Sequence, residues 1–177
     1  YGLYLFLDGA RLGYGLAAPD NDLTLPDIAA LCDVFYIGGT KVGALFGEAV
    51  VIKNPELAQD FRYLIKQNGG MLAKGRLLGL QFDALFTDGL YQEISAHAIA
   101  MAEKLREAFT AKGYTYLAPN RTNQIFVIVP DAHLAKISEQ FEYSYDQRID
   151  TTHSCVRFCT GWATKEENVD ALIRCVE

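Results

Sequence analysis

The sequence predicts an α/β fold in its first part and a smaller α+β domain in its last part. Two short apolar runs, residues 3–7 and 34–37, have the near-continuous hydrophobic character of parallel strands that are covered on both faces. A helical segment between them completes a strand–helix–strand unit, the building block of parallel sheets. From residue 114 onward, short strands alternate with helices, which is typical of an α+β domain.

The boundaries of the elements follow from hydrophobic periodicity and from the residues that interrupt it. Thr24, followed by Pro26 and Asp27, has the composition of a capped helix start, and Gly113 is a good C-terminal stop. Residues 9–23 are rich in Gly, Asp and Asn, so we expect a surface loop there. The expected strands cover residues 3–8, 33–37, 47–52, 114–117, 123–129, 148–152 and 155–160, and the expected helices cover residues 24–31, 54–66, 72–86, 90–112, 132–141 and 165–176.

We divide the chain into part of a large domain (residues 1–75), connecting helices (76–113) and a small α+β domain (114–177). The first strand, residues 3–8, has the character of a central strand, which needs a neighbour on each side. Too few strands follow to supply both neighbours. We therefore expect the chain to be the carboxyl-terminal part of a longer polypeptide; the alternative is an edge strand that simply begins the protein.

Composition limits the classes of partner. Half of the 177 residues are hydrophobic and 21% are charged, as in globular proteins with a substantial core. The net charge of −6 disfavours nucleic acid or an anionic membrane as the main partner, because both attract basic surfaces. The apolar runs are far shorter than the ~20 residues of a membrane span. The four cysteines match no zinc spacing, so we expect no metal site and reduced thiols in a cytoplasmic protein.

Asp8 and Lys41 carry the chemistry that the sequence predicts. Asp8 ends the first apolar run, and Lys41 follows the second run after the turn Gly38-Gly39-Thr40. The carboxyl ends of neighbouring parallel strands are where open α/β sheets bind their ligands. A carboxylate that keeps a pyridine nitrogen protonated and an amine that attacks a carbonyl are what pyridoxal 5′-phosphate (PLP) requires. The pair therefore predicts a PLP enzyme.

Five motifs in order along the chain resemble a known family. They are Asp8-Gly9-Ala10-Arg11, Gly39-Thr40-Lys41-Val42-Gly43, Gly69-Gly70-Met71, Thr122-Asn123-Gln124-Ile125-Phe126-Val127 and Val156-Arg157-Phe158. Together they resemble the low-specificity L-threonine aldolases, which belong to the β-eliminating lyases and to the fold type I PLP enzymes. The resemblance implies part of an aspartate aminotransferase-like large domain followed by the small α+β domain.

The resemblance also implies a role for each of four residues. Asp8 would pair with the pyridine nitrogen, and Lys41 would bind PLP covalently. Arg11 would contact either the cofactor or the substrate carboxylate. Arg157 would bind the substrate carboxylate, because a planar guanidinium can hold a carboxylate by two parallel hydrogen bonds.

The activity that the resemblance implies is cleavage of L-threonine or L-allo-threonine to glycine and acetaldehyde, a lyase reaction of amino-acid metabolism. We expect an amino-acid substrate, a homodimer or homotetramer, and an isolated chain with little or no turnover. Two alternatives remain open. Another PLP-dependent β-eliminating lyase or an aminotransferase would use the same residues, and a non-catalytic dimerisation module could keep the fold without the cofactor.

Overall fold

The computed structural model describes residues 1–176, which form two compact units. The first unit contains residues 1–16 and 21–94, and the second contains residues 17–20 and those from 95 onward. The expected division at residues 75 and 113 stays a prediction. No helix within residues 1–176 is both long enough and apolar enough to cross a membrane.

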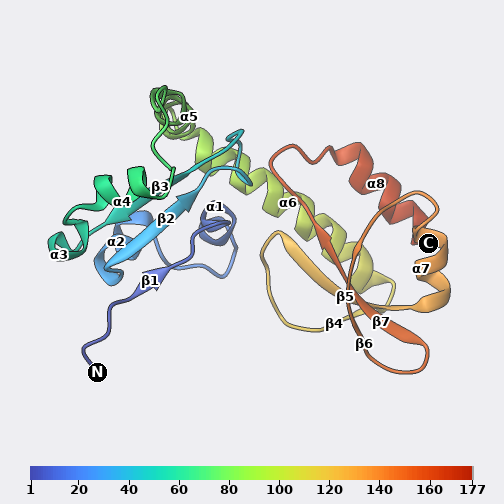
Figure 1. Ribbon diagram of the computed structural model, residues 1–177. Coiled ribbons are helices and arrows are strands. Elements are labelled where there is room, and N and C mark those ends of the chain that lie inside the picture. The colour runs from blue at the N-terminus through green and yellow to red at the C-terminus, as the bar shows by residue number, and fades with distance from the viewer. Residues whose placement is uncertain (177) are drawn as a thin grey trace. The chain divides into compact units, whose positions relative to one another are not determined.

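The first unit is built on a three-stranded sheet in the order β1 (Phe6–Leu7), β2 (Val34–Gly38), β3 (Glu48–Ile52). As predicted, β1 runs parallel to β2, with Phe6 opposite Val34, and β3 returns antiparallel, with Ile52 opposite Val34. Figure 1 shows β2 between its two neighbours. Because the β2–β3 pair is a simple antiparallel return, the loop that contains Lys41 leaves and re-enters the same short sheet.

Strand β1 is shorter than the strand expected over residues 3–8, and within the described residues it has a neighbour on one side only. Strand β1 covers only two residues and lies at the edge of the sheet. Leu3, Tyr4, Leu5 and Phe6 are exposed, with Phe6 60% accessible. Their apolar character predicted burial, but β2 is the only strand of the described residues that pairs with β1, so the other edge stays open.

Two helices connect β1 to β2. Helix α1 (Leu12–Leu16) lies inside the segment expected to be a loop, which corrects that prediction. Helix α2 (Leu25–Leu31) begins as predicted at a capping box. The Thr24 hydroxyl accepts from the Asp27 backbone N–H at 3.4 Å, and the Asp27 carboxylate accepts from the Thr24 backbone N–H at 2.8 Å. These bonds satisfy backbone donors that a helix start leaves unpaired.

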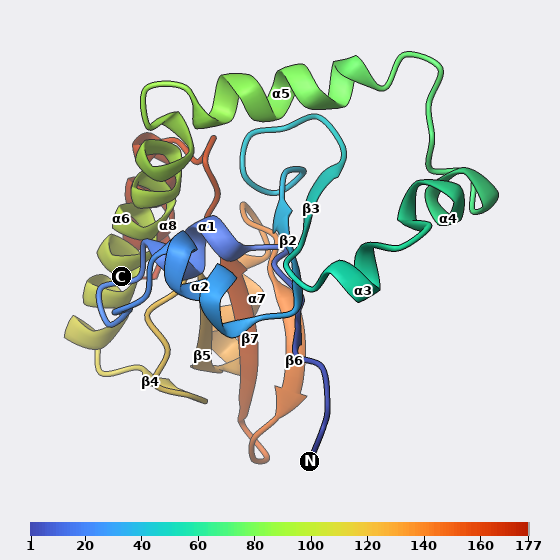
Figure 2. The ribbon, with the colours of Figure 1, turned by 90° about the vertical axis from the view of Figure 1, so that its left-hand side faces the viewer.

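The helix expected over residues 54–66 is two helices, α3 (Pro55–Ala58) and α4 (Phe61–Gln67). The break lies at Asp60, whose φ of 58° is left-handed and cannot continue an α-helix. Helix α5 (Arg76–Phe86) follows after the Gly69-Gly70 turn. Figure 2 shows α5 lying over the loop between β2 and β3.

The second unit packs helices on one face of an antiparallel sheet. Its elements are α6 (Leu90–Ala111, which begins in the first unit), β4 (Thr115–Tyr116), β5 (Gln124–Pro130), α7 (Asp131–Ile137), β6 (Ser144–Arg148), β7 (His153–Cys159) and α8 (Glu166–Cys175), with strand order β4-β5-β7-β6. Alternate residues of β5 and β7, including Ile125, Val127, Val156 and Phe158, enter one core with side chains of α6, α7 and α8. The opposite face of the sheet carries polar residues, Arg157 among them.

The strand expected over residues 148–152 is wrong. Residues 144–148 form β6, and residues 149–152 form the turn that joins β6 to β7. Asp150 explains the turn, because its Oδ1 accepts from the backbone N–H of Thr152 at 2.7 Å and of His153 at 2.8 Å. A short acidic side chain that takes backbone donors in this way competes with strand pairing.

The capping box gives the first prediction. Thr24→Ala removes the oxygen that accepts from Asp27 N–H, so we expect the free energy of unfolding to fall by about 1 kcal/mol. Chemical denaturation followed by circular dichroism measures this change. Thr24→Ser keeps the oxygen and should stay within about 0.5 kcal/mol of the parent. Equal losses in the two variants would contradict the capping role.

Candidate active site

Close contact between the ends of β1 and β2 fixes the geometry of the first unit. The Gly38 N–H donates to the Gly9 carbonyl at 2.9 Å. A Cβ atom on Gly9 would lie 1.7 Å from the Tyr36 carbonyl oxygen, and one on Gly38 would lie 2.3 Å from the Ala10 carbonyl oxygen. Only glycine allows backbones to approach this closely. The two glycines therefore bring the segment after Asp8 against the segment before Lys41.

Asp8 follows β1 directly, as the sequence predicts. Its Oδ1 accepts from the Ala10 backbone N–H at 3.0 Å and from the Tyr36 hydroxyl. The Tyr36 hydrogen bond, then the Ala10 one, lowers the pKa of Asp8 below its usual 3.8. Both bonds end on Oδ1, so Oδ2 can accept from another group. The carboxylate is thus ionised and oriented at neutral pH.

Lys41 lies in the turn after β2, and its side chain is exposed. The backbone of this turn is held tightly: Val42 N–H donates to the Gly39 carbonyl at 2.9 Å, and the buried Tyr14 hydroxyl donates to the Lys41 carbonyl. The charges of Lys41 and, to a smaller extent, Arg11 also lower the pKa of Asp8. Lys41 and Arg11 therefore both lie within electrostatic reach of Asp8.

Helix α5 forms hydrogen bonds with the loop between β2 and β3. Gln81 accepts from the Leu45 backbone N–H at 2.7 Å and donates to the Phe46 carbonyl at 3.3 Å. Glu48, at the start of β3, accepts from the Gly39 N–H at 3.1 Å. Side chains from two elements therefore restrain the loop between β2 and β3, so the position of Lys41 does not depend on its own short turn alone.

Three tyrosines that the sequence patterns did not single out support this site. Besides Tyr14 and Tyr36, Tyr91 of α6 accepts from the Gly13 N–H at 2.9 Å. Burial raises the pKa of Tyr91 to about 12, so the hydroxyl stays neutral and can serve α1 as an acceptor. A tyrosine in an apolar strand or helix must find a partner for its hydroxyl, and this is the only signal that the sequence carried.

The residues around Asp8 fit the cofactor that the resemblance implies. PLP offers a ring nitrogen that needs an anionic acceptor and an aldehyde that needs an amine. Asp8 has an unused carboxylate oxygen and a lowered pKa, and Lys41 has an exposed amine. Arg11, half-buried at the start of α1, adds a cation. These residues could hold the ring side of PLP.

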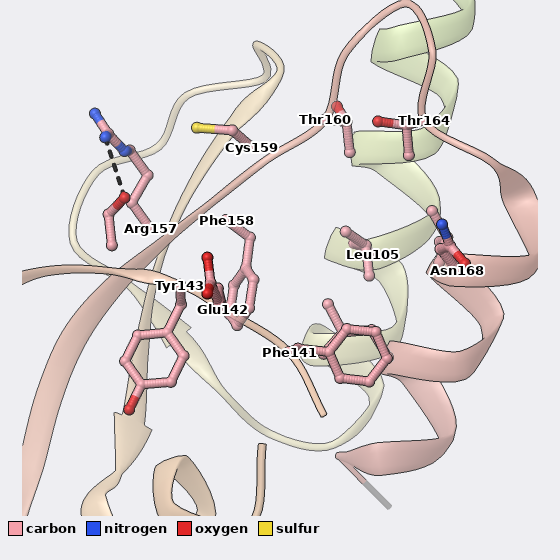
Figure 3. Close-up of a pocket in the computed structure, with 13 residues that line it drawn as sticks. Leu105, Phe141, Glu142, Tyr143, Arg157, Phe158, Cys159, Thr160, Thr164 and Asn168 are labelled. Atoms are coloured by element: carbon pink, nitrogen blue, oxygen red, sulfur yellow. Dashed lines mark hydrogen bonds between the residues drawn. The ribbon is translucent and has the colours of Figure 1, made fainter. Parts of the chain in front are cut away.

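Arg157 lies in the second unit, on the strand β7, and is partly buried. Its Nη1 donates to Gln124 Oε1 at 3.2 Å and its Nη2 donates to Ser144 Oγ at 3.3 Å. As alternation predicts, Arg157 and Cys159 project from one side of β7 and Phe158 from the other (Figure 3). Arg157 borders a cavity of about 350 Å³ that Phe141, Tyr143 and Thr164 also line.

A second cavity in the same unit, about 490 Å³, contains His133 and His153. His133 Nδ1 lies 2.7 Å from the Tyr114 hydroxyl, and His153 Nδ1 lies 3.1 Å from Asp150. The Nδ1 atom of each imidazole ring thus already has a hydrogen-bond partner. Within residues 1–176 no three or more His, Cys, Asp or Glu side chains are grouped so that they could hold a metal ion.

Comparison with known proteins first gives the class. The chain aligns over 99% of its length with 42% of tryptophan decarboxylase from Catharanthus roseus, at a TM-score of 0.72 and 14% sequence identity, a likeness of fold alone. No family model matches the sequence. The fold is that of part of a fold type I PLP-dependent enzyme, as predicted from the sequence.

Two further comparisons narrow the class. The low-specificity L-threonine aldolase of Pseudomonas sp. (strain NCIMB 10558) is 31% identical over 175 residues, which are 97% of this chain and 49% of that protein. A structure of Leishmania major threonine aldolase matches 99% of this chain and 51% of that chain, with a TM-score of 0.96 and 43% identity. The chain spans about half the length of these relatives. It is homologous with threonine aldolases over that half, so the predicted resemblance is confirmed.

The contact between β1 and β2 gives a second prediction. Gly9→Ala would force its Cβ against the Tyr36 carbonyl, so we expect a loss of roughly 3 kcal/mol or more of unfolding free energy. Gly15→Ala is the matched control, because Gly15 lies in α1 and no atom would come within 4 Å of the added methyl group. That change should be neutral or stabilise by about 0.5–1 kcal/mol. Similar denaturation midpoints for both variants would contradict the constraint.

The pair formed by Tyr36 and Asp8 gives a third prediction. The hydrogen bond to Asp8 raises the pKa of Tyr36 to about 12. The stabilisation that this shift represents is complete below the unfolded pKa of about 10 and is lost as pH rises through the folded value. Asp8→Asn should lower the pKa of Tyr36 toward 10, measured by NMR titration of tyrosine Cζ. Tyr91, whose pKa burial raises to about 12, is the internal control and should not change. A Tyr36 value still near 12 in Asp8→Asn would exclude the pairing.

Proposed function

We propose that this chain contributes Asp8, Lys41, Arg11 and Arg157 to a PLP-dependent lyase that cleaves L-threonine or L-allo-threonine to glycine and acetaldehyde. The observation that carries the proposal is the 43% identity and TM-score of 0.96 to Leishmania major threonine aldolase over 99% of the chain. The arrangement of Asp8 and Lys41 at the ends of paired parallel strands supports it independently.

PLP, when bound, supplies a ring that accepts the electron pair released as the substrate bond breaks. Asp8 would hold a proton on the ring nitrogen, for which its lowered pKa suits it. Tyr36 would keep the carboxylate oriented through Oδ1 and leave Oδ2 for the nitrogen. Lys41 would supply the amine that anchors the aldehyde. Each role matches the charge and the hydrogen bonding of the side chain concerned.

The arginines would fix the substrate. Arg157 has neutral hydrogen-bond partners, so its charge is available to an amino-acid carboxylate. Two parallel hydrogen bonds from a guanidinium would set the direction of the Cα–Cβ bond. Arg11 would add positive charge beside Asp8 and Lys41 and contact either the cofactor or the carboxylate. This division of roles would orient the substrate before bond cleavage.

We also propose a homo-oligomer, dimer or tetramer. In the first unit several large apolar side chains are exposed, among them Leu45 (84% accessible), Tyr63 (76%) and Leu80 (57%). Soluble proteins rarely leave many such side chains in water without a partner surface. A second polypeptide surface over these residues would remove them from solvent.

The proposal makes a fourth prediction. After reduction of a mixture of PLP and this chain with borohydride, peptide mapping should find the pyridoxyl group on Lys41. Lys41→Ala should abolish the label, whereas Lys53→Ala, a change at another lysine of the same unit, should keep it. Labelling spread over several lysines, or retained in Lys41→Ala, would contradict the assignment.

The activity is tested in the longest natural polypeptide that contains this chain. L-Threonine should give equal amounts of glycine and acetaldehyde, and Lys41→Ala should lower the rate at least about a thousandfold. Formation of a 2-oxo acid would indicate another lyase or an aminotransferase. Absence of both Lys41 labelling and amino-acid turnover would favour the non-catalytic module, which keeps the fold without the cofactor.

A further inference from the structure

We propose that Gln124 and Ser144 are positioning residues that hold the Arg157 guanidinium in place while leaving its charge free for a carboxylate. The inference deepens the proposed function and rests on the role proposed there for Arg157. It concerns two side chains on the strands that flank Arg157, and neither carries chemistry of its own.

The register of the sheet explains why these two residues meet Arg157. On β5, Phe126 lies opposite Arg157, so Gln124 is two residues away on the same face. On β6, Ser144 lies directly opposite Arg157. The guanidinium is therefore held from both sides, by Gln124 Oε1 on Nη1 at 3.2 Å and by Ser144 Oγ on Nη2 at 3.3 Å. Figure 3 marks one hydrogen bond of the Arg157 guanidinium as a dashed line.

The neutrality of both partners distinguishes Arg157 from three other arginines of the second unit. Arg106 and Arg121 both pair with Glu103, and Arg148 pairs with Asp131. Among residues 1–176, Arg157 has no such carboxylate partner, although Glu142 lines the same cavity. An arginine held by a carboxylate has its charge compensated. An arginine held by an amide and a hydroxyl keeps its charge for a ligand.

The donors of Arg157 are also incompletely used. A guanidinium has five N–H donors, and Gln124 and Ser144 accept from two of them, which leaves three. The Nε–H is among these three, and it is buried without any acceptor in the described residues. Buried donors are nearly always paired, so this N–H needs an acceptor that the described residues do not supply. A carboxylate accepts from two parallel N–H donors, and Arg157 has three N–H donors that no described residue uses.

Ordering the side chain in advance has a physical consequence. A long side chain loses rotamer freedom when it is fixed, and this loss opposes ordering. If neighbours already fix Arg157, a ligand need not supply that cost on binding. Removing the Gln124 oxygen should therefore weaken carboxylate binding about tenfold, although Gln124 never touches the ligand.

The neighbouring thiol supplies a matched control. Cys159 Sγ lies 3.8 Å from the same Gln124 oxygen, and Cys159 is exposed. Cys159→Ser therefore alters a contact of Gln124 while leaving both hydrogen bonds of Arg157 in place. If the effect of changing Gln124 were a general disturbance of this sheet face, Cys159→Ser would produce part of it.

The test is NMR of the arginine side-chain N–H groups in the chain of residues 1–177, with glycine and acetate as probes. In the parent, the Arg157 Nε–H should exchange slowly with water and shift when glycine is added. Gln124→Met should speed exchange about tenfold and weaken glycine binding to a similar degree. Ser144→Ala should act in the same direction, and Cys159→Ser should leave both quantities unchanged.

The variant Gln124→Glu separates the effect of holding the guanidinium in place from the effect of leaving its charge uncompensated. It keeps the acceptor oxygen, so exchange should stay slow, but its carboxylate competes for the guanidinium, so glycine should bind more weakly. A purely structural role for Gln124 would not split the two readouts in this way. Unchanged Nε–H exchange in Gln124→Met, in a protein with an unaltered unfolding midpoint, would overturn the positioning role.

Arg157→Lys distinguishes failure of this inference from failure of the proposed function. Weaker glycine binding in Arg157→Lys supports the carboxylate role on which the inference rests. If Arg157→Lys binds glycine as the parent does, Arg157 is not the carboxylate site and the proposed function loses that residue. If instead Arg157→Lys weakens binding and Gln124→Met does not, the proposed function stands and the positioning role fails.

Discussion

The first unit depends on one backbone constraint, the contact between the end of β1 and the end of β2. Gly9 and Gly38 lack the Cβ atoms that would collide with the carbonyls of Tyr36 and Ala10. Because the strands can close to this distance, a hydrogen bond of 2.9 Å joins Gly38 to Gly9. Asp8 and the turn that contains Lys41 therefore follow the same end of the sheet. The chemistry proposed for Asp8 and Lys41 thus depends on two glycines, because any larger residue at either position would clash with the facing backbone.

Three tyrosine hydroxyls of this unit restrain the segments around Asp8 and Lys41 by hydrogen bonds. Tyr36 binds Asp8, Tyr14 binds the carbonyl of Lys41, and Tyr91 binds the backbone of α1. Each tyrosine has an apolar ring that packs and a hydroxyl that reaches a polar group, which suits a position between core and site. The functional side chains are therefore restrained by neighbours that have no direct part in the reaction, a usual requirement of pre-organised sites.

In the second unit, too, neighbouring side chains restrain the residue proposed to bind the substrate. One face of β5 and β7 is apolar and packs on three helices, which leaves the other face free for polar groups. Arg157 stands on that free face between an amide and a hydroxyl. Rigid strands hold both neighbours, so the guanidinium is fixed by elements whose own stability comes from the core behind them.

Much of this architecture could be predicted from the sequence because its signals are local. The capping box at Thr24, the parallel pair β1–β2, the antiparallel return of β3 and the stop at Gly113 all follow from residue type and spacing. Five motifs, including those around Asp8, Lys41 and Arg157, indicated the family resemblance because they occur together and in order.

The tertiary structure decided what depends on partners distant in sequence. The apolar run of residues 3–7 predicted a buried strand, yet burial depends on neighbours and β1 has only β2 among the described strands. The turn at Asp150 and the break at Asp60 were set by single side-chain or backbone geometries that periodicity does not detect. The bond of Tyr36 to Asp8 and that of Gln124 to Arg157 span 28 and 33 positions. Sequence determined which groups were available, and the pairing of strands determined which of them meet, because hydrogen bonds form only between atoms that the fold brings within reach.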